Sequence, residues 1–580
     1  MPTLWLALLC VASSATNLGN HYTQDDMPVI QRNPTIHTLT EPWAFFTQSY
    51  WPKPYPPALY RPFTSLTFAV EWALSGGEPW FYRATSILLY LAAGLAFYAL
   101  LRRLVSREAA WIATALFMVH PVHVEAVAIA VNQSELMTGL LAVLAVSLYL
   151  KTREDGRFDA RRGALLFALY LAACLYKESG LVIIGLLVAA ELTVVKTDES
   201  LKARLRHARP LLLVMLLGAA SFFAIRTLAL GGDAVGTFKA EALDGLGMGQ
   251  RALTMLPVVP HWVRLLLWPA HLQGDYSPKE LEAATTWGGD QTLGLLILLL
   301  ALLLAFGSWK KRPVVTLGIM WLAIGIFPVS NVLIPTGIML AERTLFLPSI
   351  GMMLVVAGVL EPVLQWAAGK TSPRQDDKEA RGLRGRLTVR QWMGAVVLGA
   401  ILLMGLTRSA SRQMVWRDQF TYWHQTTIDA PKSYRAHHAL AQLLFQVGEK
   451  RWAETEYKKS IELYPRTWGV YFDLANKYRL NNMCEPATKL YQRTLLVEPE
   501  HEAARGALIA CLLNLGRYEE AKHEAREGIS YGSRPARVRL FQRFYQIADS
   551  AIKVDAKPGT VAIHMSAADT IPARSPVGAR

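Results

Sequence analysis

Residues 292–306 read TLGLLILLLALLLAF, an unbroken apolar run without a charged side chain. A helix needs about 17 to 25 residues of this kind to cross the hydrocarbon core of a bilayer. Comparable runs recur through the first 410 residues, so this stretch is one member of a set. The clearest others are Thr85–Leu101, Leu211–Leu230, Val314–Val332, Phe346–Trp366 and Trp392–Leu406.

Five shorter apolar runs complete the set. Each alone is compatible with a buried helix of a soluble protein, but their place among longer runs favours short spans packed against other helices. Leu4–Thr16 lacks the basic start of a secretory signal, so we interpret it as a first span, with a cleaved signal as the alternative. The others are Ala109–Val122, Leu136–Leu150, Ala164–Tyr176 and Leu181–Val195. The sequence therefore predicts about eleven transmembrane helices in residues 1–410.

The composition of the 580 residues agrees with a membrane protein. Hydrophobic residues make up 52% and charged residues 18%, below the roughly 25% charged residues of soluble domains. The net charge of +15 lies in short loops between apolar runs, which argues against nucleic-acid binding. Four cysteines without a CxxC spacing exclude a disulfide framework.

Basic loop residues define the predicted topology, because Lys and Arg in short loops stay on the cytoplasmic side. All basic clusters fall on that side if residues 231–290 form an outer interfacial segment. The first outer loop is then 17–80, and the chain after Ser411 is periplasmic or lumenal. The membrane is the bacterial inner membrane, or the ER membrane in a eukaryote. The clusters are Arg102–Arg107, Lys151–Arg162, Lys196–Arg209, Lys310–Arg312 and the cytoplasmic loop 367–391.

From Tyr434 onward the sequence is polar and repeats at intervals of 34 residues. Ala453, Ala487 and Ala521 are spaced by 34, the period of tetratricopeptide helix pairs, in which small residues let paired helices pack. We predict an α-solenoid of three repeats within 434–533, a generic protein-binding surface. Its parts are a connector 411–433, repeats 434–467, 468–501 and 502–535, and a disordered tail 551–580.

Ionisable residues form four clusters at the predicted outer ends of the spans. At membrane depth such residues usually face a cavity or the bundle interior. Their convergence suits a reaction on a phosphate-bearing lipid, in which basic groups hold phosphate and a carboxylate accepts a proton. The clusters are Asp25 and Asp26 with Tyr60 and Arg61; His120, His123, Glu125 and Glu135; Lys177 with Glu178; and Glu342 with Arg343.

The sequence does not indicate a cofactor. His120, His123 and Glu125 are an alternative metal site, but their spacing is not that of a helical ligand pair, and we predict no metal. A phosphate-cradling GxxxxGK[ST] loop and a dinucleotide fingerprint are both missing from the sequence, so a soluble nucleotide cofactor is not expected.

Five strings in order resemble the transmembrane-and-tetratricopeptide-repeat (TMTC) family of O-mannosyltransferases or its bacterial relatives. The resemblance implies a GT-C glycosyltransferase fold, a catalytic acidic pair at Asp25-Asp26, a polyprenyl-phosphate sugar as donor, and a protein Ser or Thr hydroxyl as acceptor. The family's K-E-x-G motif corresponds to Lys177, Glu178 and Gly180, and its A-E-R loop includes Glu342 and Arg343. The strings are DDMPVIQRNP (25–34), YRPFTSLTF (60–68), HPVHVEAV (120–127), KESG (177–180) and AERTLFLPSIG (341–351).

These observations lead to one preferred hypothesis and two alternatives. Asp25 or Asp26, with Asp25 preferred from the family's order, deprotonates the acceptor hydroxyl, and Arg61, Lys177 and Arg343 stabilise the departing phosphate. The single displacement inverts the anomeric carbon, and the repeats recruit the protein acceptor. One alternative is an O-antigen ligase or polymerase that uses a diphosphate donor. The other is a non-enzymatic membrane-anchored scaffold or lipid flippase.

Overall fold

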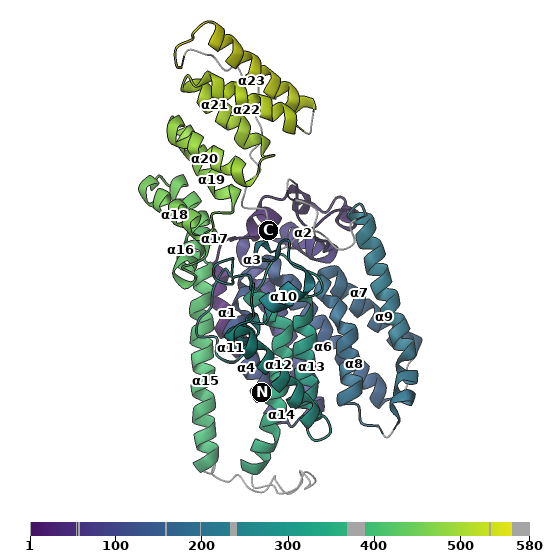
Figure 1. Ribbon diagram of the computed structural model, residues 1–580. Helices are drawn as coiled ribbons and strands as arrows, with labels where there is room; N and C mark the ends of the chain where they lie inside the picture. The colour runs from purple at the N-terminus through teal and green to yellow at the C-terminus, as the bar shows by residue number, and fades with distance from the viewer. Residues whose placement is uncertain are drawn as a thin grey trace. The chain divides into compact units, whose positions relative to one another are not determined.

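A computed structural model describes residues 2–53, 55, 59–156, 159–197, 199–232, 240–367, 389–532 and 535–559. These residues form helices and turns without a strand, which confirms the predicted all-α class. The chain divides into two compact units (Figure 1). The first contains residues 1–276 and 281–425, and the second contains residues 277–280 and 426–580.

Helices of the first unit have the length and composition of membrane spans. Within the described part of the chain, seven pass this test, and an eighth is formed if the bent pair α4 (Arg107–Met118) and Pro121–Ala128, with a 48° bend, is one span. The polytopic helical organisation is therefore confirmed. The seven are Pro2–Gly19, Pro79–Leu104, Ala130–Glu154, Ala208–Ala229, Gly289–Ser308, Glu342–Ala367 and Val389–Trp416.

The three remaining predicted spans correspond to shorter helices. These are α7 (Ala160–Tyr176), α8 (Ile183–Thr193) and α13 (Pro313–Ile326). The spans themselves are built on α1 (Pro2–Ser14), α3 (Pro79–Leu104), α6 (Gln133–Glu154), α9 (Leu201–Ala229), α12 (Gly289–Ser308), α14 (Phe346–Ala367) and α15 (Val389–Gln413).

Close backbone contact joins α13 and α14. A Cβ atom on Gly318 would lie 2.5 Å from the carbonyl oxygen of Gly351, and one on Gly351 would lie 2.6 Å from the carbonyl oxygen of Gly318. Small residues are typical of helix interfaces in membranes, where close packing rather than the hydrophobic effect holds helices together. This contact fixes the start of α14, which follows Arg343.

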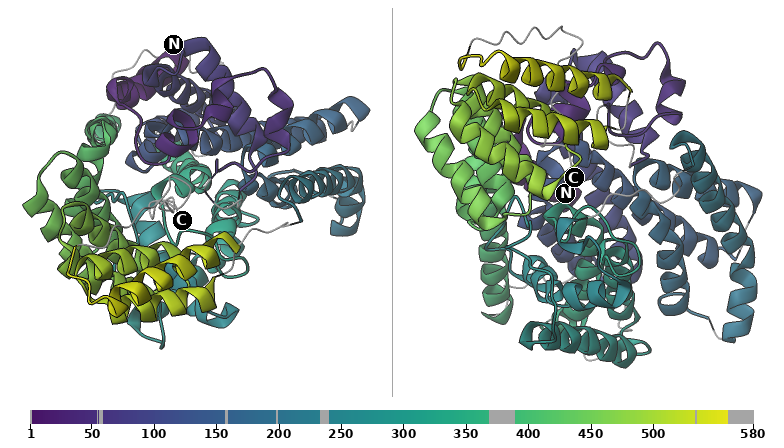
Figure 2. Two further views of the ribbon diagram at one scale, coloured as in Figure 1. Left: turned by 90° about the horizontal axis from the view of Figure 1, so that it is seen from above. Right: turned by 45° about the horizontal axis from the view of Figure 1, so that its top comes forward.

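The candidate site residues lie in short segments between the long helices. Helix α2 (Pro62–Ser75) lies across one end of the bundle, while the α14 C-terminus and the α15 N-terminus lie at the opposite end (Figure 1). Figure 2 shows α7, α8 and α9 as a layer on one side of this unit. The short segments are η1 (Ala15–Gly19), η2 (Met27–Gln31), η3 (Pro34–His37), η4 (Pro42–Phe46), η5 (Pro121–His123), α5 (Val124–Ala128), η6 (Ala130–Asn132), η7 (Glu178–Val182) and η10 (Glu342–Leu345).

The predicted interfacial segment 231–290 contains two short amphipathic helices in its described part. Helix α11 (Val258–Leu267) buries Trp262 and Leu265, whereas Leu267 and the following Trp268 are exposed. The neighbouring elements are η8 (Glu241–Leu243) and α10 (Met248–Met255), and η9 (Phe327–Val329) follows α13. Of the predicted cytoplasmic loop 367–391, residues 368–388 lie outside the described residues.

Three helix pairs form most of the second unit, after η12 (Met414–Trp416) and α16 (Gln419–Asp429). Their first helices begin at Tyr434, Trp468 and Glu502, at the 34-residue interval of the buried alanines. A further helix, α23 (Pro535–Lys553), packs on the last pair. Residues 560–580 of the predicted tail lie outside the described residues. The pairs are α17 (Tyr434–Gln446) with α18 (Lys450–Leu463), α19 (Trp468–Leu480) with α20 (Cys484–Val497), and α21 (Glu502–Asn514) with α22 (Tyr518–Tyr531).

Candidate functional site

The two adjacent aspartates occupy different environments. The side chain of Asp26 is fully buried, and it forms an ion pair with Arg83 at 2.9 Å. Its two oxygens also accept the backbone N–H groups of Ala130 (3.3 Å) and Val131 (3.0 Å). Burial raises the pKa of Asp26, while Arg83 and the two N–H groups favour the charged form. Asp26 therefore anchors the first outer loop to η6.

Asp25 remains partly exposed beside this anchor. The preceding residue, Gln24, has a left-handed φ of 47°, a conformation that costs energy for a residue with a Cβ and that persists where surrounding contacts enforce it. Here the Gln24 amide contacts the Tyr422 hydroxyl, and the Asp26 N–H donates to the Thr23 carbonyl oxygen at 3.0 Å. The charge of Asp25 interacts electrostatically with Arg343.

Lys177 and Arg343 are each paired with a buried glutamate. Lys177 contacts Glu135, and Arg343 contacts Glu125 through its guanidinium and through its backbone N–H at 2.8 Å. The glutamate side chains are only 5% and 3% exposed, whereas the two cations retain 15% and 14%. Each glutamate thus holds one side of its cation and leaves another side accessible.

Arg61 is held by Glu178 and by an aromatic ring. Its guanidinium lies 3.0 Å from the Glu178 carboxylate and 5.2 Å from the ring centre of Tyr50. Arg226, near the C-terminus of α9, contacts the same carboxylate at 3.2 Å. Burial opposes the charge of Glu178, but Arg61 and Arg226 hold its pKa down at about 2. Glu178 is therefore a charged link between α9 and the start of α2.

The three predicted phosphate-binding cations form one cluster, which we call the cation cluster: Arg61, Lys177 and Arg343. Burial lowers the pKa of Lys177, and the positive charges of Arg61 and Arg343 lower it further, against the effect of Glu135. The charge of Glu135 also acts on Arg61 and Arg343. These groups come from segments far apart in the sequence, and the charge of Asp25 also acts on Arg343.

The other predicted site residues have structural contacts. Both ring nitrogens of His123 are hydrogen-bonded, to the Tyr90 hydroxyl and the Ser349 hydroxyl at 2.8 Å each. His120 bonds to the Leu266 carbonyl oxygen at 2.9 Å, and its other nitrogen accepts the Val122 N–H. Tyr60 is buried, and its hydroxyl donates to the Phe46 carbonyl oxygen. Glu342 is also buried, and its carboxylate accepts hydrogen bonds from the Gln273 N–H and the Tyr276 hydroxyl.

The segment around His120 and His123 lies at the end of α4, where His123 is buried. It folds into the bundle because its apolar neighbours Val122, Val124 and Ala126 are buried there. With their ring nitrogens engaged, the two histidines do not form a metal site with Glu125. No group of three His, Cys, Asp or Glu side chains within the described ranges is arranged to hold a metal ion.

Gly180 of the KESG motif has a steric role. A Cβ atom there would lie 2.5 Å from the carbonyl carbon of Ala173 and 2.6 Å from the nitrogen of Cys174, both in the α7 backbone. Backbone atoms cannot yield as a flexible side chain does. Only glycine therefore lets η7 fold back onto α7 with Lys177 and Glu178 in place.

We expect Gly180→Ala to displace Lys177 and Glu178 and to reduce activity by about 10²-fold, since misplacement of a functional group by about 1 Å has this effect. The matched control is Gly185→Ala, where a Cβ would meet only the side chain of Ile324 at 3.2 Å. The measurement is the rate of sugar transfer per folded protein. Equal rates in the two variants would contradict the assignment.

Three charged residues around the site are not predicted from the sequence. Arg226 is the single charged residue of the predicted span Leu211–Leu230, and an ionisable residue in a span is itself a signal of function. Arg83 precedes a predicted span, and Glu71 lies in the first outer loop. The residues with which they pair are distant in the sequence, so no local sequence motif identifies these contacts.

Comparison with known sequences identifies relatives among animal protein O-mannosyl-transferases, which confirms the resemblance. The chain is 23% identical over 473 residues to the protein O-mannosyl-transferase F38B6.6 of Caenorhabditis elegans, across 80% of this chain and 62% of that protein. It is 26% identical over 503 residues to human TMTC4, across 78% and 65%, and 23% identical over 563 residues to mouse TMTC3, across 86% and 60%. The chain thus spans less than two thirds of the length of these relatives. No family model matches it.

Among solved structures, the archaeal oligosaccharyltransferase AglB of Archaeoglobus fulgidus, in complex with an inhibitory peptide and a dolichol-phosphate, aligns with 76% of this chain and 59% of its own. The sequence identity is 16% and the TM-score is 0.43.

Proposed function

We propose that this protein is a membrane glycosyltransferase that moves mannose or another hexose from a polyprenyl-phosphate donor to Ser or Thr hydroxyls of proteins. The observation that carries the proposal is the electrostatic interaction of the partly exposed Asp25 with Arg343 of the cation cluster. A carboxylate that interacts with a cluster of three partly exposed cations provides both a base and a phosphate site. The similarity to protein O-mannosyl-transferases supports the same class of reaction.

In the proposed reaction, Asp25 removes the proton of the acceptor hydroxyl as its oxygen attacks the anomeric carbon of the sugar. The bond between that carbon and the phosphate oxygen breaks, and the polyprenyl phosphate leaves with the electron pair. Its added negative charge is stabilised by Arg61, Lys177 and Arg343, which are fixed in advance by their glutamate partners. One displacement inverts the configuration. The residues present supply these roles without a cofactor.

We assign the donor phosphate to the cation cluster, with the polyprenyl chain between helices. The layer of α7, α8 and α9 carries Lys177, Glu178 and Arg226, so the lipid would lie against it. We propose that the reaction takes place on the periplasmic or lumenal side of the membrane, because the basic loops at the other ends of the spans stay on the cytoplasmic side.

The decisive experiment is a transfer assay with the purified protein in lipid vesicles. The assay contains a polyprenyl-phosphate hexose and a Ser/Thr-rich peptide, and intact-mass spectrometry reads the product. We expect the addition of single hexoses. Transfer of a preassembled glycan from a diphosphate donor would identify a ligase or polymerase instead, and no transfer from any lipid-linked donor would reject the proposal.

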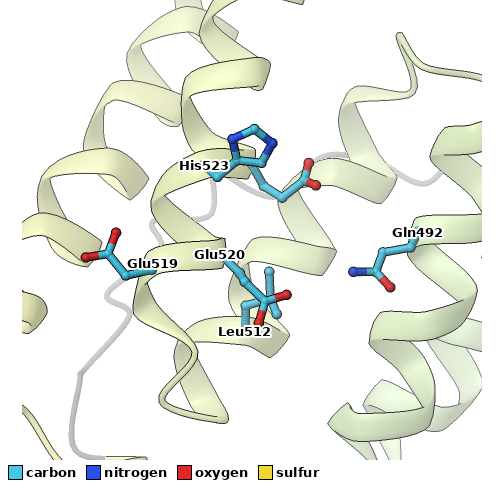
Figure 3. Close-up of a pocket in the computed structure, with 6 residues that line it drawn as sticks. Gln492, Leu512, Glu519, Glu520 and His523 are labelled. Carbon is cyan, nitrogen blue, oxygen red and sulfur yellow. The ribbon is translucent and has the colours of Figure 1, made fainter.

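We also propose that the helix pairs recruit the protein acceptor. A pocket of about 360 Å³ in the second unit is lined by acidic and polar side chains of three helices (Figure 3). Within it, Glu524 pairs with Arg505 at 2.5 Å, and Glu520 pairs with Arg517 at 2.6 Å. The lining residues are Gln492, Leu512, Glu519, Glu520, His523 and Glu524. This lining favours basic or hydroxyl-rich segments.

Glu519→Lys is expected to raise the KM for a folded protein acceptor by about two- to fivefold, because an exposed ion pair contributes up to about 1 kcal/mol. The KM for a short peptide should not change, since a short peptide does not need the second unit. Glu500→Lys, exposed in the loop between α20 and α21, is the matched control. Equal changes with both acceptors would argue against recruitment.

A further inference from the structure

A buried polar cluster lies behind the aspartate pair. It consists of Glu71 in α2, Arg83 in α3 and Gln133 in α6, which we call the support cluster. Their exposed fractions are 3%, 0% and 1%. None of them has a role in the proposed reaction, yet burial of two ionisable groups and an amide is costly unless they are bonded.

Hydrogen bonds connect the support cluster to the turn that carries Asp25. The Gln133 amide donates to Glu71 Oε1 at 2.9 Å and to the Tyr82 carbonyl oxygen at 3.2 Å. Arg83 Nη2 donates to the Asp26 carboxylate at 2.9 Å and to the His21 carbonyl oxygen at 2.6 Å. The cluster thus joins three helices to the residues on both sides of Asp25.

Several polar atoms of this cluster are buried and have no protein partner. They are Glu71 Oε2, Gln133 Oε1, Arg83 Nε and Arg83 Nη1, together with the hydroxyl of Thr23. Buried polar atoms in proteins are bonded to protein or to ordered water. This set contains both N–H donors and oxygen acceptors.

We propose that Glu71, in its neutral form, is a positioning residue for Asp25 and that it acts through Gln133, Arg83 and Asp26. The inference rests on the proposed function, because Asp25 is the proposed base. Neutral Glu71 leaves Asp26 as the single anion that Arg83 must neutralise. Asp26 then keeps its bonds to Ala130 and Val131, and the strained turn at Gln24 holds Asp25 toward the cation cluster.

Ionisation of Glu71 would add a second carboxylate that competes with Asp26 for Arg83. The charged and titratable groups that face Glu71 are Asp26, Arg83, Tyr22 and Tyr82. Burial raises the pKa of Glu71 to about 8, and the charge of Asp26 raises it further, against hydrogen bonds with Gln133 and Thr85 and the charge of Arg83. Glu71 is therefore neutral at pH 7 and ionises in mildly alkaline solution.

The test is the pH dependence of transfer in vesicles with the full chain, as kcat and KM for the peptide. For a group with a pKa near 8, the neutral fraction falls about tenfold between pH 7 and pH 9, and we expect kcat to fall by that factor. Glu71→Gln stays neutral, so its kcat should not show this tenfold fall between pH 7 and pH 9. The exposed Glu78→Gln is the matched control and should follow the wild type.

Thermal unfolding gives a readout that does not need activity. When an acid has a raised pKa in the folded state, the free energy of unfolding of the protein falls as the pH rises from about 4.5 to about 8. The Tm of Glu71→Gln minus that of the wild type should therefore increase over this range and then stay constant. If Glu71→Gln does not accumulate, Gln133→Met removes the hydrogen bond that lowers the pKa of Glu71, so it should move the loss of activity upward.

Identical pH profiles of active wild type and Glu71→Gln, or a constant Tm difference, would overturn the inference. Absence of transfer by the wild type at every pH would instead reject the proposed function.

Discussion

Asp25→Asn is expected to reduce sugar transfer by about 10²- to 10⁴-fold, the usual contribution of a general base. The amide cannot accept the proton of the acceptor hydroxyl, and the partly exposed side chain permits the replacement without disturbing the core. The amount of folded protein and its Tm should stay close to those of the wild type. The rate is measured per folded protein in the vesicle assay.

Asp26→Asn is the matched comparison, one residue away, with the same chemical change. Here the loss should be in stability, by about 3–5 kcal/mol, because the buried Arg83 loses its counterion. The fraction that folds should retain more activity than Asp25→Asn. If Asp26→Asn were stable and inactive while Asp25→Asn remained active, the assignment of the base would be reversed.

The sequence could not separate these two aspartates. Their difference depends on Arg83 and on the backbone of Ala130 and Val131, which lies 104 and 105 residues further along the chain. The histidines show the same limitation, because the partners of the His123 ring, Tyr90 and Ser349, are distant in the sequence. The burial of these polar side chains depends on partners far away in the sequence. The hydropathy pattern along the chain gives no information about such partners.

Features that depend on local pattern were predicted well. Long apolar runs correspond to the long helices of the first unit, because length and composition alone let a helix span a bilayer. The tetratricopeptide assignment stays a prediction, although the helices that begin at Tyr434, Trp468 and Glu502 keep the 34-residue interval of Ala453, Ala487 and Ala521. By contrast, Glu125 and Glu135 were grouped with the site, but the pairing of Glu125 with Arg343 required the fold.

Arg343→Met is expected to lower kcat by about 10²- to 10³-fold, which is the loss found when one preorganised group that stabilises developing negative charge is removed. We also expect a higher KM for the lipid donor. The Arg343 side chain is 14% exposed, so the departing phosphate would lose an accessible cation. The KM for the peptide acceptor should change less. The initial rate of sugar transfer is measured while the concentrations of donor and acceptor are varied separately.

This variant also leaves Glu125 buried without its counterion, so part of the loss would reflect damage to the fold. Glu125→Gln combined with Arg343→Met removes both charges and separates the two effects. We expect the double variant to recover Tm but not donor use, because a neutral pair can pack without attracting phosphate. Recovery of both would mean that Arg343 only balances Glu125, and the donor phosphate would then have to be held by Arg61 and Lys177 alone.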